Sequence, residues 1–119
     1  MSKIVQAVNT MIENPKLITK VIRSGDELFF LYKNKYKWSM TKRQGTYLLW
    51  FYPGEETLEQ LVSYEVQEWD DVAMVTYRDS DIGTREAKSS FSELYQLLQE
   101  KVHGVNDVLD DIISDDSLL

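Results

Sequence analysis

The sequence predicts an α+β fold: an antiparallel sheet of about five strands with helices packed mainly on one face. Three observations support this class. Residues 17–52 hold four apolar or alternating segments separated by short turns, the pattern of an antiparallel meander. Segments with helical spacing of apolar residues lie before and after the meander, and residues 72–78 form one more β-branched segment. The expected order is α-ββββ-α-β-α-α, in a single domain over residues 1–119.

The first helix is expected over residues 3–13. Ser2 is a suitable N-cap, and Asn14-Pro15 ends the helix because the residue before proline avoids the α region. Its apolar stripe consists of Ile4, Val5, Val8, Met11 and Ile12.

The four strands of the meander are expected over residues 17–23, 28–33, 36–41 and 46–52, with turns at 24–26, Asn34-Lys35 and 42–45. In the third strand, Tyr36, Trp38 and Met40 alternate with Lys37, Ser39 and Thr41. This alternation predicts one buried and one solvated face.

The fourth strand is apolar on both faces. Leu48, Trp50 and Tyr52 lie on one side, and Tyr47, Leu49 and Phe51 lie on the other. The strand is therefore either central and covered on both sides, or it offers its second face to a partner.

A capping box at Thr57 and Gln60 predicts a short helix to about residue 66. Because Val62, Tyr64 and Val66 alternate, a strand over residues 62–68 stays open as an alternative. The fifth strand is expected over residues 72–78, followed by a polar loop at 79–83.

The strongest helical pattern follows this loop, with Thr84 as cap and Gly104 as end. A later capping box at Ser90 and Glu93 leaves residues 84–89 extended as an alternative. A last short helix has Asn106 as its cap and Val108, Leu109, Ile112 and Ile113 as its apolar side, and its end frays at 115–119. The predicted core contains Val8, Ile12, Phe30, Trp38, Leu48, Trp50, Leu61, Val75, Phe91, Leu94 and Leu98.

Charge is distributed unevenly along this acidic chain. The net charge is −7, but residues 16–45 carry eight basic groups against two acidic ones, and residues 46–119 carry four against 17. Oppositely charged segments of this kind can pair within the chain, pair between copies, or attract a charged partner.

Composition restricts location and chemistry. Without cysteine the chain has no disulfide, no cysteine-ligated zinc and no thiol nucleophile, which favours a reducing compartment. No apolar run reaches the about 18 residues of a membrane span, and the first residues lack the apolar core of a signal peptide. We therefore expect a cytoplasmic protein with no membrane contact.

No catalytic or metal-binding constellation is evident. His103 is the only histidine and falls at a helix end, where a structural role is expected. The segment from Asp79 to Gly83 fits neither the spacing of an EF-hand nor that of a phosphatase Asp-x-Asp-Gly-Thr motif. The acids of the last helix read as a solvated face. We expect no enzyme activity, no cofactor and no metal.

The basic part of the meander is the sharper candidate site. Lys33, Lys35 and Lys37 alternate with aromatic residues, and nucleic-acid binding uses cations for phosphates and flat rings for bases. However, alternation also sends the lysines to the face opposite Tyr36 and Trp38, so the alternative is a core of aromatic residues with the lysines on a solvated sheet face. The candidate interaction surface consists of Lys33, Lys35, Lys37, Lys42, Arg43, Tyr47 and Phe51.

In size, acidic balance and order of elements the chain is similar in outline to the small secretion chaperones of bacterial type III systems and to bacterial immunity proteins. The likeness includes no residue motif, so it assigns no functional residue. We predict a small non-catalytic accessory protein that binds another protein as an inhibitor, immunity factor or chaperone, or that self-associates. The alternative is a nucleic-acid-binding protein that uses residues 32–43.

Overall fold

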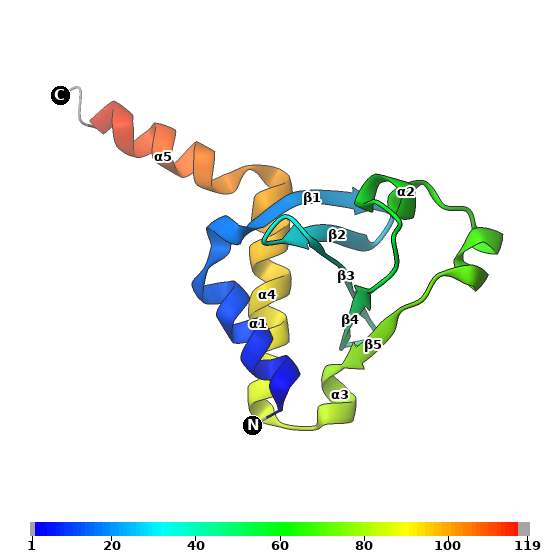
Figure 1. The fold of residues 1–119 in the computed structure, drawn as a ribbon. Coiled ribbons are helices and arrows are strands. Elements are labelled where there is room, and N and C mark those ends of the chain that lie inside the picture. Colours follow the sequence, from blue (N-terminus) through cyan, green and yellow to red (C-terminus); the bar gives the residue numbers. More distant parts are fainter. Residues whose placement is uncertain (1, 117–119) are drawn as a thin grey trace.

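The structure, a computed structural model, describes residues 2–116 and confirms the α+β class. A five-stranded antiparallel sheet has the strand order β1-β2-β3-β4-β5 (Figure 1). The strands are β1 Ile18–Ser24, β2 Glu27–Tyr32, β3 Tyr36–Arg43, β4 Thr46–Tyr52 and β5 Val75–Arg78. The helices are α1 Lys3–Glu13, η1 Pro15–Leu17, α2 Leu58–Ser63, η2 Val66–Asp71, α3 Asp79–Ile82, α4 Arg85–His103 and α5 Val105–Asp116, where η marks a 3₁₀ helix.

Two hairpin turns set the register of the meander. Gln44 and Gly45 both have positive φ, 52° and 79°, as the central residues of a type I′ turn require. At the β2–β3 turn the positive φ values belong to Lys33 and Asn34. The prediction of Asn34-Lys35 as the two central residues of this turn is therefore wrong by one residue. Asparagine tolerates the left-handed conformation at the second central position as well as at the first.

The edge strand β1 is irregular. Its register with β2 shifts between Thr19 and Ile22, and Lys20 has a φ of 54°. Such a bulge twists the edge and interrupts the row of free backbone groups that another strand could pair with.

The two long helices α1 and α4 cover one face of the sheet (Figure 1). Ser2 and Thr84 cap them as predicted, so the alternative of an extended segment over 84–89 is wrong. Beneath them, the buried side chains are Val8, Met11, Ile18, Leu28, Phe30, Tyr32, Met40, Tyr47, Leu49, Phe91, Leu94 and Leu98.

The other face of the sheet is covered as well. The capping box of Thr57 and Gln60 starts α2, whose Leu58 and Leu61 pack on Phe29, and Trp69 of η2 stacks against the same ring. The predicted solvated face of β3 is therefore wrong, since Ser39 and Thr41 are fully buried. Of the two possibilities for β4, a central strand covered on both sides is confirmed.

The region after the meander differs most from the prediction. The α2 helix ends at Ser63 rather than near 66, and residues 66–71 form η2, so no strand occurs over 62–68. The fifth strand starts only at Val75, which is 42% exposed and so is not part of the core. The predicted loop at 79–83 contains the single-turn helix α3. Ile12, Trp38 and Trp50 are partly buried rather than central to the core.

The last helix starts at Val105, directly after Gly104, so Asn106 lies within the helix and its prediction as the cap is wrong. Of the segment predicted to fray, residues 115–116 belong to α5 and 117–119 lie outside the described residues. Figure 1 shows α5 projecting from the end of α4, away from the sheet.

Candidate interaction surfaces

The structure distributes the predicted interaction residues over several separate places. Lys42 and Arg43 lie at one end of β3, whereas Lys33 and Lys35 lie in the turn at its other end. The Lys42 ammonium is 5.3 Å from the centre of the Tyr47 ring, and Arg43 Nε is 3.3 Å from Asp26 Oδ2. The basic residues therefore do not form one continuous stripe.

Lys37 turns toward the chain after β4. Its ammonium donates hydrogen bonds to the backbone carbonyls of Gly54, at 2.5 Å, and of Glu56. These bonds fasten the segment that leads into α2. The Lys37 ammonium is therefore used by two backbone acceptors of this segment, and Lys37 is not an exposed contact residue.

Tyr47 is buried rather than available to a partner, so this part of the predicted surface is wrong. Only 7% of it is exposed, because α4 covers this end of β4. Its ring centre lies 5.5 Å from that of Tyr95, and its hydroxyl donates to Ser92 Oγ at 3.3 Å. Its backbone N–H donates to Asp79 Oδ1 at 2.9 Å, which ties β4 to α3.

An apolar groove of about 350 Å³ lies between α1 and the aromatic end of β2, β3 and β4. Tyr36 is 40% exposed, whereas Trp38 and Phe51 are half-buried with ring centres 4.9 Å apart. We call this feature the aromatic groove. Its lining consists of Ala7, Thr10, Met11, Tyr32, Tyr36, Trp38 and Phe51.

Two of the predicted lysines stand beside rings that line the aromatic groove. The Lys35 ammonium is 4.7 Å from the centre of the Tyr36 ring, and the Lys33 ammonium is 6.0 Å from that of Tyr32. At these distances each cation is attracted to the ring face. Trp38 Nε1 is enclosed and has no hydrogen-bond acceptor among the described residues. The groove therefore combines an apolar floor with a basic border.

The second exposed apolar surface is one side of α5. The large side chains that follow its helical spacing are 50–67% exposed: Val108, Leu109, Ile112 and Ile113. At 3.6 residues per turn, Asp110 and Asp111 fall on opposite sides of this apolar stripe, whereas Asp107 falls on the far side of the helix. The helix is amphipathic, and its apolar stripe has an acidic border.

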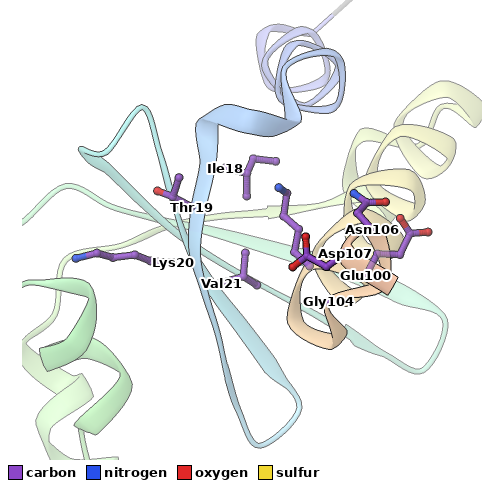
Figure 2. Close-up of a pocket in the computed structure, with 9 residues that line it drawn as sticks. Ile18, Thr19, Lys20, Val21, Glu100, Gly104, Asn106 and Asp107 are labelled. Atoms are coloured by element: carbon purple, nitrogen blue, oxygen red, sulfur yellow. The ribbon is translucent and has the colours of Figure 1, made fainter. Parts of the chain in front are cut away.

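A polar hollow of about 370 Å³ lies where β1 meets the junction of α4 and α5 (Figure 2). Ile18 and Val21 point toward the junction, while Lys20 extends to the other side of β1. There its ammonium lies 3.3 Å from Glu59 Oε1. The N–H of Glu59 itself and then Lys20 lower the pKa of this carboxyl below its usual value. Glu100 of α4 and Asn106 and Asp107 of α5 line the hollow, so its side at the helix junction is polar.

One buried polar cluster lies beneath the α2 face. Ser39 Oγ is 2.5 Å from Glu27 Oε2 and 2.6 Å from the Tyr52 hydroxyl, which lies 3.2 Å from the same carboxylate. Burial raises the pKa of Tyr52 well above its usual value. Glu27 adds to this rise, and the bond to Ser39 opposes it. With Ser39 fully buried, the cluster joins strands rather than presenting a nucleophile.

The remaining candidate residues for chemistry are used elsewhere. The Asp79 carboxylate is buried against β4, and Asp81 lies 3.6 Å from Arg78. Among residues 2–114, whose side chains the structure describes, no three side chains of the metal-binding types gather closely enough to hold an ion. None of the helices in this part of the chain has the length and hydropathy needed to cross a bilayer.

Sequence reasoning found three residues of the aromatic groove region, Lys33, Lys35 and Phe51, but missed most of its lining. The alternation in β3 predicts a buried position for Tyr36 and Trp38; in α1, Ala7 borders the apolar stripe, whereas Thr10 lies on the exposed side of the helix. One available signal was that the face of β3 carries aromatic residues nearest the hairpin turn, where a covering helix ends. Comparison of the chain with protein-family models, with curated proteins and with solved structures found no match in any of the three.

Proposed function

We propose that the protein is a non-catalytic binding protein whose aromatic groove receives an amphipathic helix with acidic flanks from another protein. The observation that carries this proposal is the groove itself, apolar on its floor and bordered by Lys33 and Lys35. Amphipathic helices commonly bind proteins by placing their apolar face in such a groove.

The residue types in the groove support this function. Tyrosine, tryptophan and phenylalanine are enriched at the centres of protein interfaces, where they contribute most of the binding free energy. Here Tyr36, Trp38 and Phe51 are held partly exposed by the strand register, beside Met11 of α1. The two lysines favour a partner with carboxylates next to its apolar residues.

The arrangement of the basic residues favours protein binding over the nucleic-acid alternative. A nucleic-acid strand needs cations spaced along its phosphates. Lys37 donates to two backbone carbonyls, Arg43 lies beside Asp26, and Lys42 lies at the far end of β3 from Lys35. In the part of the chain that the structure describes, only Lys33 and Lys35 lie over rings that line the aromatic groove, those of Tyr32 and Tyr36.

The test is capture of partners from native lysate, with and without nuclease, by three tagged proteins. These are the wild type, the double variant Lys33→Glu/Lys35→Glu, and the matched control Lys42→Glu/Arg43→Glu, which makes the same charge change at the other end of β3. Captured proteins are identified by mass spectrometry, and their contact with the groove is mapped by cross-linking.

The proposal expects a protein that survives nuclease, is lost with the variant at Lys33 and Lys35, is kept by the control, and cross-links through an acidic amphipathic helix. Equal capture by all three proteins would show that the groove is not the binding site. Capture that disappears with nuclease would replace this function with nucleic-acid binding.

A further inference from the structure

We propose that one occupant of the aromatic groove is the α5 helix of a second copy of this chain, in a dimer with two reciprocal contacts. This inference rests on the proposed function, because it assigns the groove a specific helical partner. The two surfaces, one concave and one helical, lie on the same molecule and match in both polarity and charge.

The polarity match involves two apolar features that the described part of the chain leaves uncovered. The stripe of α5 exposes four large aliphatic side chains, Ile113 by 67%. The aromatic groove offers Tyr36, Trp38 and Phe51 beside Met11. Contiguous apolar surface of this kind marks an interaction site in a protein that stays in solution.

The charge match lies at the borders of the same surfaces. Asp110 and Asp111 flank the stripe of α5, one on each side, and Lys33 and Lys35 flank the groove. Glu13 and Lys16, near the end of α1, carry opposite charges, so together they add no net charge near the groove. Two basic residues of the positively charged segment 16–45 thus meet two acidic residues of the negatively charged segment 46–119 when the helix of one copy enters the groove of the other.

The orientation of α5 favours a contact between copies. Figure 1 shows the helix directed away from the sheet, so in this conformation its stripe does not reach the groove of its own chain. A two-fold dimer covers both grooves and both helices at once, since each subunit gives one helix and receives one. An α5 that bent back at Gly104 onto its own groove would instead leave the chain monomeric.

The experiment is sedimentation equilibrium of the purified full chain over about a hundredfold range of protein concentration. Two charge-reversal variants are compared, Lys33→Glu/Lys35→Glu in the groove and Asp110→Lys/Asp111→Lys in the helix. The control Asp70→Lys/Asp71→Lys makes the same charge change as the helix variant, at exposed residues of η2. Circular dichroism confirms that each variant is folded.

We expect the wild type and the control to dimerise as concentration rises, and each groove or helix variant alone to lose at least about tenfold in dimer affinity. Mixing the two variants restores the dimer as a heterodimer, because the basic helix then meets the acidic groove and the acidic helix meets the basic groove. A monomeric wild type, or a mixture that stays monomeric, overturns the inference. Either result leaves the proposed function standing if lysate capture still depends on Lys33 and Lys35.

Discussion

The helices α4 and α5 follow each other across Gly104 and share one sequence pattern, yet the fold treats them differently. In α4, the apolar residues Phe91, Leu94 and Leu98 are fully buried against the sheet. In α5, Val108 and Ile112 are more than half exposed. Periodicity therefore predicts that a segment is helical and which side is apolar, but it does not say whether anything covers that side.

This difference has a consequence for how each helix is stabilised. Helices in proteins gain most of their stability from packing of the apolar face, and an isolated helix shorter than about 12–15 residues is marginal in water. With 12 residues and an exposed stripe, α5 lies at that limit. The 19-residue α4 has both length and a covered face. A partner that covers the stripe would give α5 the stabilisation that α4 gains from the sheet.

The largest difference should appear when one apolar side chain is truncated in α4 and, in a second variant, one in α5. Leu94→Ala leaves a cavity in the core and should lower the free energy of unfolding by about 2–5 kcal/mol. Ile112→Ala removes a side chain that is 59% exposed and should change it by less than about 0.5 kcal/mol in the monomer. Urea denaturation at low protein concentration measures both.

Equal losses for the two variants would break the comparison, because they would show that α5 packs on the body of its own chain. A loss for Ile112→Ala that grows with protein concentration would sharpen it. In that case the stripe is covered by a second copy of the chain, and dimerisation adds to the free energy of unfolding.

A smaller effect on the free energy of unfolding is expected from the buried polar cluster beneath the α2 face. The contribution of this cluster depends on pH. Tyr52→Phe removes the hydrogen bonds to Ser39 and Glu27 and should cost about 1–2 kcal/mol at neutral pH. The folded state raises the pKa of Tyr52, so it holds this proton more tightly than the unfolded chain does. This contribution is present below about pH 10 and is lost as the pH rises above that value.

Urea denaturation of the wild type and of Tyr52→Phe across the alkaline range measures this dependence. The difference in unfolding free energy between the two should be constant below about pH 10 and shrink above it. Tyr36→Phe, at the exposed edge of the groove, serves as a control that should change little at neutral pH. A difference for Tyr52→Phe that stays constant to high pH would show that the hydroxyl is not buried as described.

Local patterns were sufficient for much of the fold. The caps at Ser2, Thr57 and Thr84 start helices where the sequence predicts them, and β4 has the predicted bounds. These features depend on contacts a few residues apart, such as the bond from the N–H of Ala87 to Thr84 Oγ1 at 3.1 Å. Such contacts can be read from a single sequence.

The missed features depend on contacts between distant segments. The polar residues Ser39 and Thr41 predict a solvated face for β3, but they are buried because Ser39 finds Glu27 and Tyr52, and Thr41 finds the carbonyl of Asp26. The aromatic groove likewise exists because α1 packs beside the β2–β3 hairpin. No spacing within either segment records that neighbour, so the groove could not be predicted, although Phe51 of its lining and the two lysines beside it belong to the predicted surface.

The last expected effect concerns the junction of the two helices, where a small change in stability should accompany a change in association. Gly104 has a φ of 65°, and an added Cβ would meet no atom within 4 Å, so Gly104→Ala carries only the conformational cost of a left-handed residue, about 1 kcal/mol. Since α5 is exposed, the chain can avoid this cost by continuing α4 straight into α5. That change redirects the stripe without disturbing the core.

We therefore expect Gly104→Ala to unfold nearly as the wild type does but to dimerise at least about tenfold more weakly. Gly104→Asn, which tolerates the left-handed conformation, should keep more of the dimer affinity. Sedimentation equilibrium beside urea denaturation separates the two quantities. If Gly104→Ala dimerises as well as the wild type, the direction of α5 has no part in association, and the contrast between the two helices reduces to burial alone.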